Sequence, residues 1–218
     1  MRKKLRSLTL LALFAGLTTS LSAQEFTRKE ARSALFASVG ANHATIMNVE
    51  NRSEVEPLWG LNAGIGFVGV LNKRGTTMIS IEALFSMQGT KLTGAVNSTD
   101  PEQMKLNYFN FPVMVRHHPF KNFRSFYITA GPQISLHAGG HVLTEDGSKM
   151  EFKEGFVTKT LFDGVAGAGV LFGRTLNGGL QFNYQHGFTN ILQNAEFKNS
   201  VYQVKLIFPF DFLQFLAM

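Results

Sequence analysis

The chain has 218 residues, of which 21 are phenylalanine and 21 are glycine, and it contains no cysteine. This length accommodates one domain, and the lack of cysteine excludes disulfides, thiolate metal sites and a cysteine nucleophile. Charged residues make up only 17% of the chain, and no apolar run of about 20 residues follows the N-terminal region, so the sequence predicts no membrane-spanning helix after it.

Residues 1–23 have the pattern of a secretory signal peptide. Four basic residues lie among the first six, residues 8–17 are apolar but too short to span a bilayer, and residues 21–23 resemble a cleavage site. The alternative is a short N-terminal membrane anchor. Of the 21 basic residues, 17 lie outside this segment, against 15 acidic ones. The remaining charge of about +2 does not indicate a nucleic-acid partner.

Residues 24–34 are polar, and we expect them to form a periplasmic lead-in to a domain that spans residues 35–218. From residue 35 onward, large apolar side chains alternate with small or polar ones, which is the period of a β-strand. This alternation recurs in eight segments: residues 35–42, 59–67, 79–88, 108–118, 126–137, 162–172, 180–188 and 201–210.

The links between these segments alternate in length. Short links are expected at residues 71–75, 119–124 and 173–177, and long polar links at residues 46–57, 91–102, 140–159 and 190–199. Short turns on one side and long loops on the other are typical of an antiparallel meander that closes into a membrane barrel. Both ends of the domain then lie on the short-turn side.

The composition of the two faces favours a membrane barrel over a soluble one. One face is dense in Phe and Leu, which suits lipid, and backbone pairing in lipid requires a closed barrel. The other face is mostly Gly, Ser, Asn and Gln, which suits a narrow lumen filled by side chains. The sequence therefore predicts an all-β, eight-stranded antiparallel up-and-down transmembrane β-barrel.

Four charges fall on the polar face: Glu82, Arg116, Asp163 and Lys205. We expect them to form a lumen charge network with a structural role, in which Glu82 pairs with Arg116 or Lys205. Counting outward from the link near residues 96–100 places Glu82 opposite residues 112–116. Asp163 begins its strand near the outer mouth and is the poorer candidate.

Three patterns resemble catalytic or ligand sites but lack the context that such sites need. Residues 64–69 read G-x-G-x-x-G, yet they lie within a strand and no helix follows. His117 and His118 are adjacent in a strand, so their rings face opposite ways and cannot bind one metal. Ser135, His137 and Asp163 contain the residue types of a triad, but geometry defines a triad, not composition. We predict no catalytic, cofactor or metal site.

Several short motifs, in order, resemble the PorT-like outer-membrane β-barrel family, whose architecture is that of OmpA and OmpX. The resemblance covers residues 35–210. The motifs are Gly40-Ala41-Asn42, Tyr108-Phe109-Asn110-Phe111-Pro112-Val113, Ala130-Gly131-Pro132, Asp163 with Gly167 and Gly169, and Tyr184 with Gly187, Asn190 and Ile191.

The chain departs from this family pattern at three places. Asn110 stands where the family often has a carboxylate, and Asn183 where an arginine is expected before the tyrosine. The chain also continues past Phe210 to Met218 instead of ending on phenylalanine, so the assembly signal is expected at Phe208 or Phe210.

The first hypothesis is a non-enzymatic outer-membrane barrel, exported through the periplasm, with a structural or interaction role and with outer-membrane lipid around it. The resemblance to PorT-like proteins adds an expected part in protein secretion or assembly at the outer membrane, with a secretion or surface protein as partner. A small pore or ligand carrier is the alternative, although eight strands leave little open lumen. A barrel enzyme acting on lipid or peptide is the third hypothesis.

Overall fold

A computed structural model describes residues 34–47, 55–92, 101–120, 125–144, 148–152, 157–172, 178–192 and 197–210. The signal peptide and almost all of the lead-in lie outside these residues. The nine strands are β1 (Ala34–Met47), β2 (Val55–Val70), β3 (Thr77–Leu92), β4 (Pro101–His117), β5 (Phe126–Thr144), β6 (Lys149–Glu151), β7 (Thr160–Phe172), β8 (Gly178–Gly187) and β9 (Lys198–Phe210). None of the described residues belongs to a helix long and apolar enough to cross a membrane.

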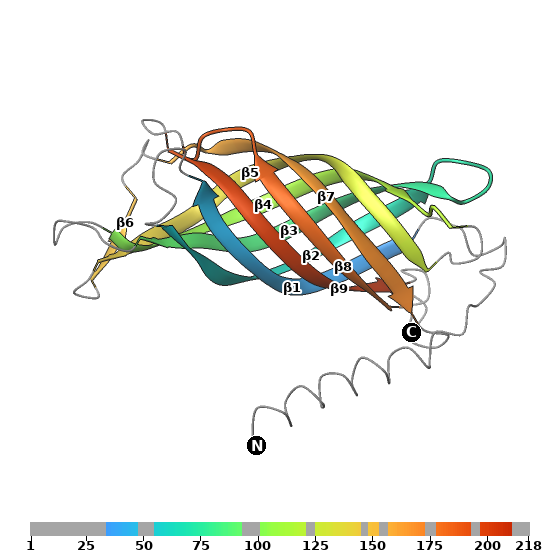
Figure 1. Cartoon of the computed structure of the whole chain (residues 1–218), viewed down its shortest axis with the longest axis horizontal. Coiled ribbons are helices and arrows are strands. Elements are labelled where there is room, and N and C mark those ends of the chain that lie inside the picture. The colour runs from blue at the N-terminus through green and yellow to red at the C-terminus, as the bar shows by residue number, and fades with distance from the viewer. Residues whose placement is uncertain are drawn as a thin grey trace, which may run out of the picture.

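Eight of the strands form a closed antiparallel barrel (Figure 1). The ring closes where β1 pairs with β9, from Leu35 opposite Phe210 to Met47 opposite Lys198. The predicted fold class is confirmed: an all-β, eight-stranded antiparallel barrel. Closure leaves no unpaired edge in the ring, because every strand there has two neighbours.

Strand β6 lies outside this ring and pairs only with the end of β5. The long link predicted around residues 140–159 therefore begins later than expected, since β5 continues to Thr144, and it contains β6, which pairs back along β5. Extending the hairpin pairs backbone groups that a plain loop would leave to water.

The two ends of the barrel differ. At one end, called here the short-turn end, lie the β2–β3, β4–β5 and β7–β8 connections together with the start of β1 and the end of β9; the opposite end is called the long-loop end (Figure 1). Strand β5 has 19 residues and β8 only 10. At roughly 3.3 Å per residue, β5 is about 60 Å long and β8 about 30 Å, so the wall is taller on the β5 side.

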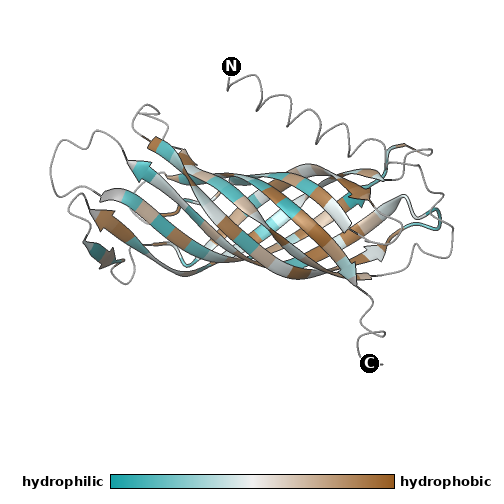
Figure 2. Cartoon of the chain, turned by 90° about the horizontal axis from the view of Figure 1, so that it is seen from below, coloured by the Kyte–Doolittle hydropathy of each residue, from teal (hydrophilic) through white to brown (hydrophobic). Residues whose placement is uncertain are grey.

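The alternation predicted from the sequence is present along the strands of the barrel (Figure 2). Large apolar side chains point outward and are exposed on the isolated chain, for example Leu61, Ile65 and Phe111. Inward positions are buried and mostly polar. His117 is exposed and His118 buried, so the two rings lie on opposite faces as predicted.

Two glycines make room for aromatic rings inside the barrel. A Cβ atom at Gly66 would lie 2.3 Å from Cζ of Phe36, and one at Gly169 would lie 2.3 Å from Cζ of Tyr127. Gly66 belongs to the G-x-G-x-x-G stretch, which lies within β2. Close approach of the Phe36 ring accounts for Gly66, and close approach of the β3 backbone accounts for Gly64, where a Cβ would lie 2.5 Å from the carbonyl oxygen of Ala83.

Candidate functional site

The lumen contains a buried ion pair between strands that are not neighbours. Lys205 Nζ of β9 lies 2.5 Å from Glu82 Oε2 of β3, and β1 and β2 separate these strands in the sheet. Ser38 Oγ of β1 donates to the other oxygen of Glu82. Both charged side chains are almost fully buried, so each depends on the other for compensation of its charge.

Asp163 forms the centre of a second polar cluster. Its Oδ2 atom accepts hydrogen bonds from Ser135 Oγ at 2.5 Å, Gln185 Nε2 at 2.9 Å and Gln133 Nε2 at 3.2 Å. Gln203 Nε2 in turn donates to Gln185 Oε1 at 3.4 Å, which links the cluster to β9. Neutral donors from two strands, β5 and β8, therefore hold this carboxylate, and no ion pair to it occurs among the described residues.

Arg116 lies in a third cluster, toward the short-turn end. Its guanidinium carbon is 4.2 Å from the ring centroid of Tyr127, which is a cation–π contact. Tyr127 OH donates to Gln181 Oε1 at 2.9 Å, and Gln181 Nε2 donates to Asn183 Oδ1 at 2.8 Å. Of the two partners considered for Glu82, the structure places Lys205 against it and Arg116 against Tyr127.

A fourth cluster joins three strands through neutral side chains. Asn62 Nδ2 donates to Asn42 Oδ1 at 2.6 Å, and Asn42 Nδ2 donates to Ser86 Oγ at 2.8 Å. Gln88 Nε2 donates to the same hydroxyl at 3.0 Å. Their residue types are those predicted for the inward face, but the sequence does not show which of these neutral side chains bond to one another.

Apolar side chains close the lumen at the long-loop end. They form one buried cluster, called here the apolar cap: Ile46, Met104, Leu106, Tyr108, Val157, Leu161, Ile191 and Leu192. Backbone hydrogen bonds fix its loop residues, since Thr158 N donates to Ile191 O and Ile191 N donates to Phe197 O. Phe36, Met114 and Ile207 are buried toward the other end.

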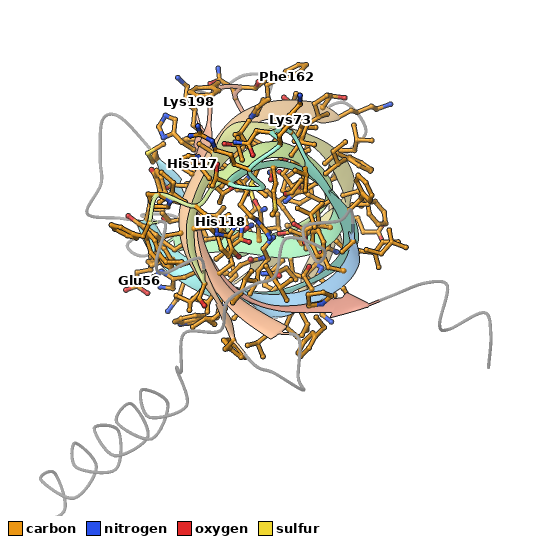
Figure 3. All side chains as sticks on the ribbon, turned by 90° about the vertical axis from the view of Figure 1, so that its right-hand side faces the viewer. Glu56, Lys73, His117, His118, Phe162 and Lys198 are labelled. Carbon is orange, nitrogen blue, oxygen red and sulfur yellow. The ribbon has the colours of Figure 1, made fainter. Side chains whose placement is uncertain are left out.

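The lumen is thus filled with side chains, as the view from the short-turn end shows, with His118 among them (Figure 3). The polar side chains of the first, second and fourth clusters, and Tyr127, Gln181 and Asn183 of the third, are hydrogen-bonded to one another within it.

The supposed triad has the wrong connectivity for nucleophilic catalysis. Ser135 Oγ donates directly to Asp163, whereas a triad requires the histidine between the hydroxyl and the carboxylate. The ring centroid of His137 instead lies 5.7 Å from the ring centroid of Tyr108 and 6.4 Å from that of Phe152. This geometry offers no activated nucleophile.

The described residues also contain no group of three His, Asp or Glu side chains that could hold a metal ion. His117 Nδ1 lies 3.1 Å from Thr77 Oγ1, and His118 Nδ1 lies 3.1 Å from the carbonyl oxygen of Phe126. Each ring therefore has a local hydrogen-bonding contact on its own face of the wall.

Comparison with known proteins agrees with this architecture. The sequence model of the family described as "Outer membrane protein beta-barrel domain" matches residues 22–193. No protein with a curated description matches the chain.

Among solved structures, Neisserial surface protein A is similar with a TM-score of 0.50 and 12% identity, over 82% of this chain and 99% of that one. The attachment invasion locus protein Ail of Yersinia pestis has a TM-score of 0.44 and 10% identity, over 82% and 99% of the two chains. OprG of Pseudomonas aeruginosa has a TM-score of 0.44 and 10% identity, over 82% and 97%. At such identities, the similarity to the Neisserial protein concerns the fold alone.

Proposed function

This chain belongs to the outer membrane protein beta-barrel domain family, and on that premise we propose that it is a closed outer-membrane barrel with a structural or interaction role. The observation that carries the proposal is the filled lumen. Glu82, Lys205, Gln185 and Gln203 each expose 1% or less of their surface in the middle of the barrel. An eight-stranded barrel has room inside for side chains and little else. This supports a role that does not require solutes to pass through the lumen.

Conductance in a planar bilayer tests this proposal against the alternative of a small pore or ligand carrier. The purified full-length protein should give no discrete conductance steps. A variant with a partly emptied lumen, Gln185→Ala with Gln203→Ala and Lys205→Ala, supplies the comparison for an opened barrel. Regular steps from the wild-type protein would contradict the proposal.

The interaction role is supported by the β5–β6 hairpin at the long-loop end. Lys149, Met150 and Glu151 of β6 are all exposed, and β6 pairs with β5 alone. An extended strand with one unpaired edge can accept a strand from another protein. In line with the resemblance to PorT-like proteins, we infer that the partner is a secretion or surface protein.

Site-specific crosslinking in native membranes tests the partner. A photo-crosslinking residue at Met150 should yield one discrete protein adduct, because β6 is the proposed contact. The same residue at Phe111, on the outward face of β4, should yield lipid adducts only. Lipid adducts alone at both positions would reject the interaction role while leaving the closed barrel in place.

A further inference from the structure

Three inward-facing polar residues, Arg116, Ser80 and Thr129, occupy neighbouring register positions on adjacent strands near the short-turn end of the lumen. Arg116 of β4 lies opposite Thr129 of β5, and on its other side it lies opposite Met78 of β3. Ser80 is two residues beyond Met78 and so shares its face. Directly opposite and diagonal neighbours of this kind lie within reach of a long side chain. All three polar residues are at least nine-tenths buried.

Each of the three residues has a buried polar atom without a hydrogen-bond partner among the described residues. These atoms are Arg116 Nε, Ser80 Oγ and Thr129 Oγ1. Buried polar groups are bonded in the large majority of cases, so three orphaned atoms on adjacent strands indicate a missing partner. A guanidinium N–H can only donate, so the partner of Arg116 Nε has to be an acceptor, and both hydroxyls are able to donate to the same acceptor.

No carboxylate forms an ion pair with Arg116 among the described residues. Both oxygens of Glu82 are engaged, one with Lys205 and the other with Ser38. Asp163 lies opposite Gln133, which is four residues beyond Thr129 on β5, or roughly 13 Å along the strand. The face of Tyr127 contacts the guanidinium carbon, but an aromatic face does not replace a counter-ion for a buried charge.

We propose that these residues form a binding site for a small monovalent anion, chloride being the probe and the natural candidate. The anion would accept hydrogen bonds from Arg116 Nε, Ser80 Oγ and Thr129 Oγ1 and would neutralise the guanidinium. Close packing sets the size limit, since Met114 and Tyr127 beside the site are buried as well. Arg116 is the penultimate residue of β4, so the site is reached from the short-turn end, where His118 is seen inside the ring of strands (Figure 3).

Thermal unfolding of the full-length protein in detergent tests the site in solution. The buffer series exchanges gluconate for chloride at constant ionic strength, so that only the identity of the anion changes. A ligand that binds the folded state alone raises stability as its concentration passes its dissociation constant. The unfolding temperature of the wild type should rise with chloride, and that of Arg116→Gln should stay flat. Lys91→Gln, which removes a partly exposed cation, should keep the full chloride response.

Two milder variants separate binding from folding defects. Ser80→Ala and Thr129→Val each remove one donor, and each should move the midpoint of the chloride response upward by roughly tenfold. A response that is equal in the wild type and in Arg116→Gln would overturn the site, as would a wild type indifferent to chloride.

A bromide-soaked crystal of the wild type provides a test that needs no variant. The anomalous difference map should contain a peak between Arg116 Nε, Ser80 Oγ and Thr129 Oγ1. Density that fits only water at this position, without anomalous signal, would overturn the proposal.

Discussion

Lys205 Nζ lies 2.5 Å from Glu82 Oε2 across the lumen, although 123 residues and two intervening strands separate the two side chains. The contact exists only because β9 closes the ring against β1. It joins the last strand of the barrel to the third, so its loss should lower the stability of the whole barrel against unfolding.

Replacement of Glu82 by glutamine should lower the unfolding temperature in detergent markedly. Removing one partner of a buried ion pair typically costs ~3–5 kcal/mol, because the other charge stays buried without compensation. The double variant Glu82→Gln with Lys205→Met should recover part of that loss. Glu56→Gln is the control: Glu56 is exposed and lies 3.9 Å from Lys91, a type of surface pair worth only ~0–1 kcal/mol. Equal unfolding temperatures for Glu82→Gln and the wild type would reject a structural role for the pair.

Gly169→Ala should destabilise the barrel through a clash inside the lumen. The new Cβ would lie 2.3 Å from Cζ of Tyr127, and overpacking of this kind typically costs ~1–3 kcal/mol. The same substitution should cost less in a Tyr127→Leu background, which removes the ring. Gly164→Ala on the same strand is the control, because its Cβ would approach only the outward-facing ring of Phe188, at 3.0 Å. Denaturant titration of the wild type, Gly169→Ala, Tyr127→Leu and the double variant measures the coupling between the two sites. Purely additive changes in the free energy of unfolding would argue against the clash.

Phe111→Arg and Val204→Arg should block membrane assembly. Both side chains point outward, and an arginine near the midplane of a barrel's lipid face costs roughly 2–4 kcal/mol. Phe111→Leu and Val204→Ile keep the surface apolar and should assemble normally. The heat-dependent gel shift of the outer-membrane fraction reports folded barrel. Normal assembly of the arginine variants would mean that lipid does not cover this face.

The short-turn end should face the periplasm and the long-loop end the outside. Because the chain contains no cysteine, single cysteines label cleanly with a membrane-impermeant maleimide. Ser148→Cys in the β5–β6 hairpin should react on intact cells, and Lys73→Cys in the β2–β3 turn only after permeabilisation. A tag in residues 96–100 should likewise be reached on intact cells, and a tag at residues 121–122 only after permeabilisation. Both stretches lie outside the described residues. Labelling of Lys73→Cys on intact cells would reverse the orientation.

Local pattern was sufficient to determine which way each strand residue points. Because side chains alternate with a strict period of two, the parity of Glu82, Arg116, Asp163 and Lys205 could be read without knowing any neighbour. The same rule separated His117 from His118. The apolar exterior and the fold class followed from repeating the pattern eight times with links of alternating length.

Which residues of β3 and β4 lie opposite each other became known only from the register in the structure. Ile81 lies opposite Val113 and Leu84 opposite Asn110, which puts Glu82 at the level of Pro112, at the edge of the range expected from the loop centre. Arg116 is therefore opposite Met78, farther along the strand. The turn geometry that sets a register is not visible in strand periodicity, and a shift of two residues moves a contact by about 7 Å.

Parity in the sequence thus determined that Glu82 and Lys205 face the same lumen, but only the closed ring decided that they meet. Contacts across a barrel depend on the stagger of all eight strands together. The total stagger cannot be read from the local sequence pattern of any one strand. The same holds for Ser135 and Asp163, which share a hydrogen bond across β5 and β7. It holds also for Arg116, Ser80 and Thr129, whose lack of an acceptor among the described residues is apparent only once three strands are placed side by side.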